Sequence, residues 1–210
     1  GISTKHNPEF TMMELYQAYS DYNGMMELTE GLVTSLAKKL LGNYEIPFGE
    51  RKINLTPPWR RATFCELLKE HGGVDFDDEA SLVKKSKELG LETKGVDRDT
   101  MANNIFEHVV EPALNNPTFV IDYPTSICPL TKRCEYDARF AQRFELYIAA
   151  MELANSYSEL NDAPEQEKRF NEQLGTEADV TGKVDDDFLT ALKYGMPPAG
   201  GLGIGIDRLI

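Results

Sequence analysis

The sequence has 210 residues, of which 41% are hydrophobic, which is enough for one globular domain with a substantial core. Its formal net charge of −13 disfavours a broad nucleic-acid-binding surface, although a local basic groove is compatible with such a charge. The three cysteines lack CxxC spacing, which indicates reduced cytosolic thiols rather than disulfides or zinc ligands. No apolar run reaches about 18 residues and no secretory leader opens the chain, so we expect a soluble, cytoplasmic protein without a membrane span.

The first expected element is a strand at HNPEFTMMELY, residues 6–16. Helical periodicity also fits its apolar residues, but Pro8 restrains the preceding residue to extended geometry and favours the strand. Alternation then places Phe10, Met12, Glu14 and Tyr16 on one face and an apolar set on the other. One face of this strand is therefore rich in chemically active groups.

The middle of the chain is expected to combine helices with short strands. Residues 24–41 predict a helix whose evenly spaced apolar side chains enter the core: Met25, Leu28, Leu32, Leu36 and Leu40. The remaining expected elements are a short strand before Pro57-Pro58, a helix up to His71, a peripheral insertion of two acidic amphipathic helices at about 75–116, a strand at 116–124, and helices at 164–170 and 186–195.

A second dense run of polar groups is RFELYIAAMELANSYSELND, residues 143–162. Strand alternation assigns one set of side chains to a shared face: Met151, Leu153, Asn155, Tyr157 and Glu159. Glu152 falls on the opposite face, so a bulge at Ala154-Asn155 is expected if Glu152 belongs to the same site. Glutamates among apolar residues are costly unless they bind a cation, a metal or a ligand ammonium, or form structural ion pairs.

Glycines alternate in the closing segment GGLGIGIDRLI. Gly201, Gly203 and Gly205 would leave one face of a strand without side chains, so that a ligand can lie directly on the backbone. The spacing fails the GxGxxG dinucleotide fingerprint and lacks the GKS/T of a P-loop. The strand leads into Asp207-Arg208 at an expected helix start, where an arginine can bind phosphate oxygens.

These three segments, in this order, resemble class II lysyl-tRNA synthetases over essentially all 210 residues. The resemblance implies an α+β fold, an antiparallel β-sheet flanked by helices. Residues 1–210 would form a partial catalytic domain, from the second strand of motif 2 through motif 3, with a helical insertion at about 75–116. Motif 1, the first strand of motif 2 and an anticodon-binding domain would lie upstream of Gly1. We therefore expect the 210 residues alone to be inactive and the full-length protein to be a homodimer.

The resemblance also assigns roles to individual residues. It implies that ATP is bound by His6, Phe10, Gly203 and Arg208, with His6 and Arg208 acting in catalysis on the phosphates. Lysine would be bound by Glu14, Tyr16, Asn155, Tyr157 and Glu159, with Tyr16 and Glu159 receiving the ε-ammonium. Mg²⁺ would be held by Glu145 and Glu152, because glutamate oxygens suit this hard cation. The implied reaction converts lysine and ATP to lysyl-adenylate and pyrophosphate, and then transfers lysine to tRNA(Lys).

Two alternatives remain open at this stage. One is a truncated relative that attaches a lysine-like amino acid to elongation factor P on the same scaffold, a group that tends to carry alanine in place of Gly203. The other is a non-catalytic, synthetase-like binding protein, which loss of Glu159, Arg208 or the magnesium pair would favour. All of those residues are present in this chain.

Overall fold

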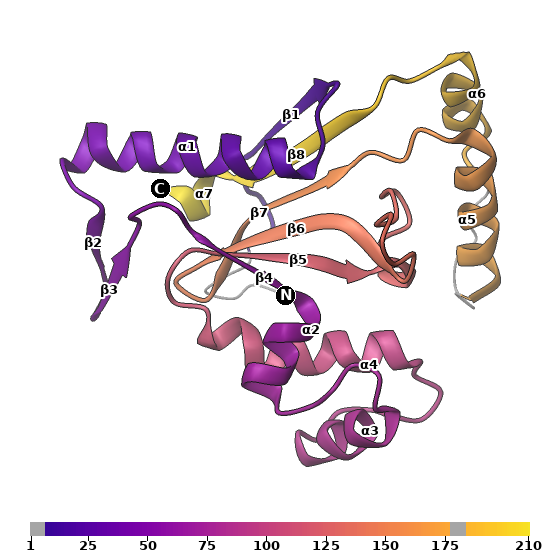
Figure 1. Ribbon diagram of the computed structural model, residues 1–210, viewed down its shortest axis with the longest axis horizontal. Coiled ribbons are helices and arrows are strands. Elements are labelled where there is room, and N and C mark those ends of the chain that lie inside the picture. Colours follow the sequence, from indigo (N-terminus) through magenta and orange to yellow (C-terminus); the bar gives the residue numbers. More distant parts are fainter. Residues whose placement is uncertain (1–6, 177–183) are drawn as a thin grey trace.

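The computed structural model describes residues 7–176 and 184–210, so that His6 lies outside the described residues. A six-stranded sheet forms its centre, with the strand order β1-β8-β7-β6-β5-β4 (Figure 1). The strands are β1 (Met12–Ala18), β4 (Arg60–Thr63), β5 (Thr118–Pro124), β6 (Phe140–Ile148), β7 (Met151–Ser158) and β8 (Ala199–Gly205). The expected antiparallel sheet is confirmed, except that β4 and β5 pair in parallel.

Helix α1 (Tyr22–Leu41) crosses one face of this sheet (Figure 1). Asp21 caps its first turn by accepting a hydrogen bond from the Gly24 amide at 3.0 Å. The helix is where the sequence predicts it, and Met25 and Leu32 of the expected stripe contact the core. The expectation is wrong for Leu28 and Leu40, which are 42% and 72% exposed. Its buried stripe contains mainly methionine and small or β-branched residues: Met25, Met26, Thr29, Val33, Thr34 and Ala37.

The physical reason is the close approach of this helix to β8. A Cβ placed on Gly200 would lie only 2.9 Å from Cγ of Met25 and 2.9 Å from the Asp21 carbonyl oxygen. The narrow space between α1 and β8 accommodates flexible or compact side chains better than a row of leucines.

A helical segment covers the β5 and β4 end of the opposite face. It contains α2 (Phe64–Leu67), α3 (Glu79–Glu88) and α4 (Arg98–Ile105), with a π-helical turn after each of α2 and α4 and a final 3₁₀ turn at Glu111–Ala113. Phe64 stacks on Phe106 with ring centroids 4.7 Å apart, and both rings pack near Tyr123. The two helices expected within residues 75–116 are therefore present, and their apolar side chains belong to one of the two cores of the sheet.

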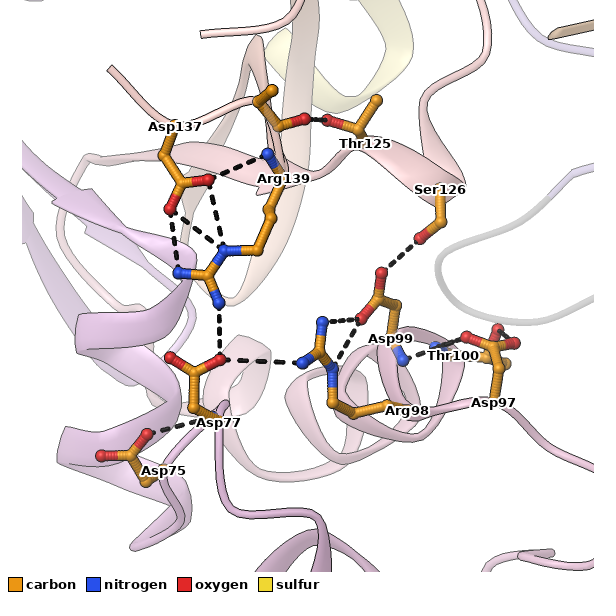
Figure 2. A network of polar contacts seen from close by, with 11 residues as sticks. Asp75, Asp77, Asp97, Arg98, Asp99, Thr100, Thr125, Ser126, Asp137 and Arg139 are labelled. Carbon is orange, nitrogen blue, oxygen red and sulfur yellow. Dashed lines mark hydrogen bonds and ion pairs between the residues drawn. The ribbon is translucent and has the colours of Figure 1, made fainter.

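A surface network of aspartates and arginines ties this segment to the loop before β6, as Figure 2 shows. Arg139 binds Asp137 and also reaches Asp77 at 2.7 Å, while Arg98 pairs with Asp99 and lies 3.7 Å from Asp77. These ion pairs are largely exposed, so each contributes little to stability, and the network chiefly sets the relative position of two loops.

The remaining elements surround the ends of the sheet. They are the hairpin β2 (Glu45–Phe48) and β3 (Arg51–Asn54), and the helices α5 (Ala163–Thr176), α6 (Asp186–Tyr194) and α7 (Ile206–Leu209). The strand at 116–124 and the helices at 164–170 and 186–195 are confirmed, whereas β2 and β4 are not predicted by the sequence. Within the described residues, no helix has the length and apolar character needed to cross a membrane.

Candidate active site

Two rows of side chains cross the face of the sheet that α1 leaves open. Directly opposed residues on neighbouring antiparallel strands share a face, so the register defines the rows. One row contains Glu14, Gly203, Asn155 and Glu145, and the next contains Tyr16, Gly201, Tyr157 and Arg143. The bare backbone of β8 thus lies between the polar groups of β1 and those of β7, as the alternating glycines predict.

A bulge in β7 brings Glu152 into this site. Leu146 is opposite Ala154, whereas Tyr147 is opposite Glu152, so Leu153 is the extra residue. Leu153 is consequently buried beneath the sheet at 6% exposure, and the expectation that it shares the face of Asn155 is wrong. The expected bulge is present, and it lies at Leu153 instead of Ala154-Asn155.

A cavity of about 540 Å³ lies over Gly203 and Gly205, beside the start of β1. Among its lining residues are Phe10, Phe48, Glu152, Asn155 and Arg208. The backbone amide of Thr11 donates to Oδ2 of Asp207 at 2.6 Å, which fastens the Phe10 segment beside the glycine strand. Arg208 donates to the Glu152 carbonyl oxygen and lies 3.6 Å from the Glu152 carboxylate. Aromatic rings, an open backbone and an arginine suit a nucleotide with its phosphates.

Glu159 lies over the next glycine of β8. A Cβ on Gly201 would collide with its Oε1, and the Tyr16 ring is 3.0 Å from that same Cβ position. Oε1 is buried and, among the described residues, has no hydrogen-bond partner. Burial raises the pKa of this carboxyl to about 7. Burial and the charge of Glu159 also raise the pKa of Tyr157 to about 12. This end of the site therefore presents an unpaired, half-buried carboxylate that a cation would stabilise.

Glu145 and Glu152 form an acidic pair at the other end of the rows. Tyr123 and Tyr147 each donate to Oε2 of Glu145 at 2.7 Å, and Arg143 forms an ion pair with its Oε1. Burial and the nearby charge of Glu145 raise the pKa of Glu152. A divalent cation would relieve this repulsion, so the donor set fits magnesium, which prefers one or two carboxylates together with phosphates and water.

The structure places the described site residues of the sequence prediction on one face. Glu14 and Tyr16 come from β1, Asn155 and Tyr157 from β7, Glu145 from β6, and Glu159 directly follows β7. Sequence reasoning missed Phe48 and Arg143. Alternation from Glu145 could have identified Arg143. No local pattern links Phe48 to the cavity, because it lies on a separate hairpin.

Comparison with known proteins identifies the family of the chain. The family described as tRNA synthetases class II (D, K and N) matches residues 1–210. Over 217 aligned residues the chain is 50% identical to the lysine–tRNA ligase of Carboxydothermus hydrogenoformans, covering 100% of this chain and 44% of that relative. It is 49% identical to the lysine–tRNA ligase of Moorella thermoacetica and 48% identical to that of Bacillus cereus, with the same coverage.

The chain spans less than half the length of these curated relatives. The match nevertheless includes every strand of the sheet and both ends of the candidate site. The chain therefore belongs to the class II tRNA synthetase family (D, K and N) and is a homologue of part of lysine–tRNA ligase.

Proposed function

We propose that the full-length protein activates lysine with ATP and transfers it to tRNA(Lys). The observation that carries this proposal is the half-buried carboxylate of Glu159, whose buried Oε1 lies over Gly201 and lacks a hydrogen-bond partner in the described part of the chain. An ammonium group would supply both the missing hydrogen bond and the missing positive charge. Such a site rejects amino acids whose side chain carries no cation, because they leave the Glu159 carboxylate unpaired.

ATP would occupy the cavity over Gly203 and Gly205, with adenine on Phe10 and the phosphates beside Arg208. His6 is assigned to the phosphates by the family resemblance. Lysine would extend from this cavity along β8, with its α-amino group at Glu14 and its ε-ammonium between Tyr16 and Glu159. Asn155 and Tyr157 complete the pocket. Its carboxylate would then face the α-phosphate, as attack on that phosphorus requires.

Glu145 and Glu152 are proposed to hold Mg²⁺ beside the phosphates. The ion, when bound, would neutralise part of the charge that builds up as the carboxylate meets ATP. Oε2 of Glu145 already accepts two tyrosine hydroxyls, and Oε1 already pairs with Arg143. The remaining lone pair of Oε1 and the carboxylate of Glu152 are therefore the available ligands. Arg208 supplies further positive charge next to Glu152 and donates a hydrogen bond to its backbone carbonyl oxygen.

The wider assignments rest on the relatives. The proposed cytoplasmic location, homodimer and tRNA partner follow from the similarity to lysine–tRNA ligases, and the tRNA would contact parts of the protein outside this chain as well. The strongly acidic charge of these 210 residues supports a tRNA site that depends on other segments.

Amino-acid-dependent exchange of pyrophosphate into ATP by the full-length protein tests the activation step. Lysine should support exchange, whereas methionine, which matches much of its length but lacks a side-chain ammonium, should not. Exchange with an amino acid whose side chain is uncharged, and not with lysine, would refute the proposal. Purified tRNA(Lys) and elongation factor P, offered in parallel with labelled lysine, identify the acceptor, and labelling of elongation factor P alone would favour the protein-modifying alternative.

A further inference from the structure

Arg143 makes four side-chain contacts next to the proposed lysine and magnesium sites. Its side chain is 17% exposed and forms an ion pair with Glu145. Nε donates to Oδ1 of Asn155 at 3.2 Å, and Nη1 donates to the buried Sγ of Cys128 at 3.3 Å. The guanidinium also lies over the Tyr123 ring, 4.8 Å from its centroid. This one side chain therefore touches a proposed magnesium ligand and a proposed lysine-binding residue at the same time.

These contacts determine which way the Asn155 amide faces. A guanidinium has donors and no acceptors, so the atom of Asn155 that meets it must be the oxygen. The amide nitrogen then remains for the cavity that Asn155 lines, opposite the bare backbone of Gly203. In lysine both nitrogen groups are positively charged donors. Because the α-amino group of lysine is placed at Glu14, which lies across Gly203 from Asn155, the carboxylate next to that amino group is the acceptor within reach of the amide.

We infer that Arg143 is a positioning residue for lysine activation: it orients Asn155 so that its amide N–H groups bind the carboxylate of the substrate. The inference rests on the proposed function and adds a residue to it. Arg143 does not itself contact lysine. Its planar fork can serve Asn155, Glu145 and Cys128 together because three of its nitrogen atoms point in separate, fixed directions.

The competing explanation is that Arg143 only neutralises Glu145 and fills space. The two explanations differ for Arg143→Lys, because lysine keeps the positive charge beside Glu145 but cannot reproduce the fork. If Arg143 orients Asn155, this variant should raise the KM for lysine by roughly 10- to 100-fold, the range for losing a hydrogen bond to a charged group. The KM for ATP should change by less than about threefold, since the charge at Glu145 remains.

The experiment uses the full-length protein and measures lysine-dependent exchange, with the KM for lysine and for ATP determined separately. Asn155→Ala and the double variant with Arg143→Lys complete a double-mutant cycle. If Arg143 acts through Asn155, adding Arg143→Lys to Asn155→Ala should have little further effect on lysine. Arg169→Lys is the matched control, because Arg169 is also buried and forked, with its partners at Glu165 and the Thr131 carbonyl. It should lower the thermal midpoint without changing the KM for lysine.

The inference would be overturned if Arg143→Lys raised the KM for lysine by the same factor in the wild-type and Asn155→Ala backgrounds. It would also be overturned if the variant raised the KM for lysine and the KM for ATP equally. An unchanged KM for lysine in Arg143→Lys would also overturn it. Each of these three results would leave the proposed function intact, provided the wild-type protein activates lysine. Failure of the wild-type protein to catalyse lysine-dependent exchange would refute the proposed function, and the inference with it.

Discussion

Replacing Glu159 by glutamine keeps the shape of the side chain and removes its charge. If the carboxylate binds the ε-ammonium of lysine, the variant loses a charge-assisted hydrogen bond in a poorly hydrated pocket. Losing such a partner costs about 2 to 5 kcal/mol, or roughly 30- to 5,000-fold in lysine affinity. Titration calorimetry with lysine, without ATP or magnesium, measures this step in isolation from the rest of the site.

The same substitution should stabilise the protein at alkaline pH. Glu159 has a pKa of about 7 in the folded protein against an ordinary 4.5, because burial disfavours its ionised form, so ionisation of this carboxylate destabilises the folded state. The folded state holds the proton more tightly than the unfolded chain, so this part of the stability is complete below pH 4.5 and is lost as the pH rises through 7. Glu159→Gln should therefore raise the thermal midpoint at pH 8 and change it little at pH 4.5.

Lysine affinity should show the opposite dependence on pH. Because the ionised form binds the ammonium, wild-type affinity should be about tenfold higher at pH 8 than at pH 6, the ratio of the ionised fractions for a pKa near 7. This dependence should disappear in Glu159→Gln.

Glu165→Gln is the matched control for this prediction. The Glu165 carboxylate is paired with Arg169 at 2.9 Å and Arg133 at 3.1 Å, and its pKa is lowered chiefly by the hydrogen bond from Arg169. Its replacement should reduce stability at neutral pH and leave lysine affinity unchanged. A Glu159→Gln protein that is destabilised at pH 8 and binds lysine normally would refute our reading of the pocket, since Glu159 would then have a structural partner.

Two further predictions concern the glycine strand and the acidic pair. Gly201→Ala should reduce lysine affinity by at least about 30-fold because the new methyl displaces the Glu159 carboxylate, whereas Gly203→Ala should cost roughly tenfold, since its methyl meets the mobile end of Met12 at 3.1 Å. Both substitutions should leave the thermal midpoint nearly unchanged. If calorimetry showed a larger loss of lysine affinity for Gly203→Ala than for Gly201→Ala, the placement of lysine over Gly201 would be contradicted. Glu152→Gln should raise the Mg²⁺ concentration needed for half-maximal exchange by about 10- to 100-fold while leaving lysine binding without ATP unchanged. The raised pKa of Glu152 implies that the wild-type protein loses stability as the pH rises, and this loss should be smaller in Glu152→Gln. An unaltered magnesium requirement would show that Glu152 is not a magnesium ligand.

Local patterns in the sequence predict several parts of the site correctly. The alternation in HNPEFTMMELY places Glu14 and Tyr16 on one face of β1, and the alternating glycines of β8 leave the facing backbone bare. Both features depend on the two-residue repeat of a strand, which any extended segment obeys whatever its surroundings. The helices at 164–170 and 186–195 and the strand at 116–124 follow from equally local signals.

Other features depend on contacts between distant parts of the chain. The bulge at Leu153 follows from the register of β7 against β6, and the buried stripe of α1 follows from its close approach to β8. Neither can be read from the periodicity of the segment itself, because the partner strand decides which residue is extra and which face is covered.

The charge properties of the site belong entirely to the tertiary structure. By itself, the sequence determined that Glu159 follows a strand rich in polar and aromatic residues. Only folding places this carboxylate over Gly201, beside Tyr16 from the start of the chain, where water is excluded and its pKa rises to about 7. Arg143 likewise gains its role from Asn155 and Cys128, which lie on other segments. Desolvation and hydrogen bonding depend on every neighbour in space, and the order of residues along one strand does not contain that information.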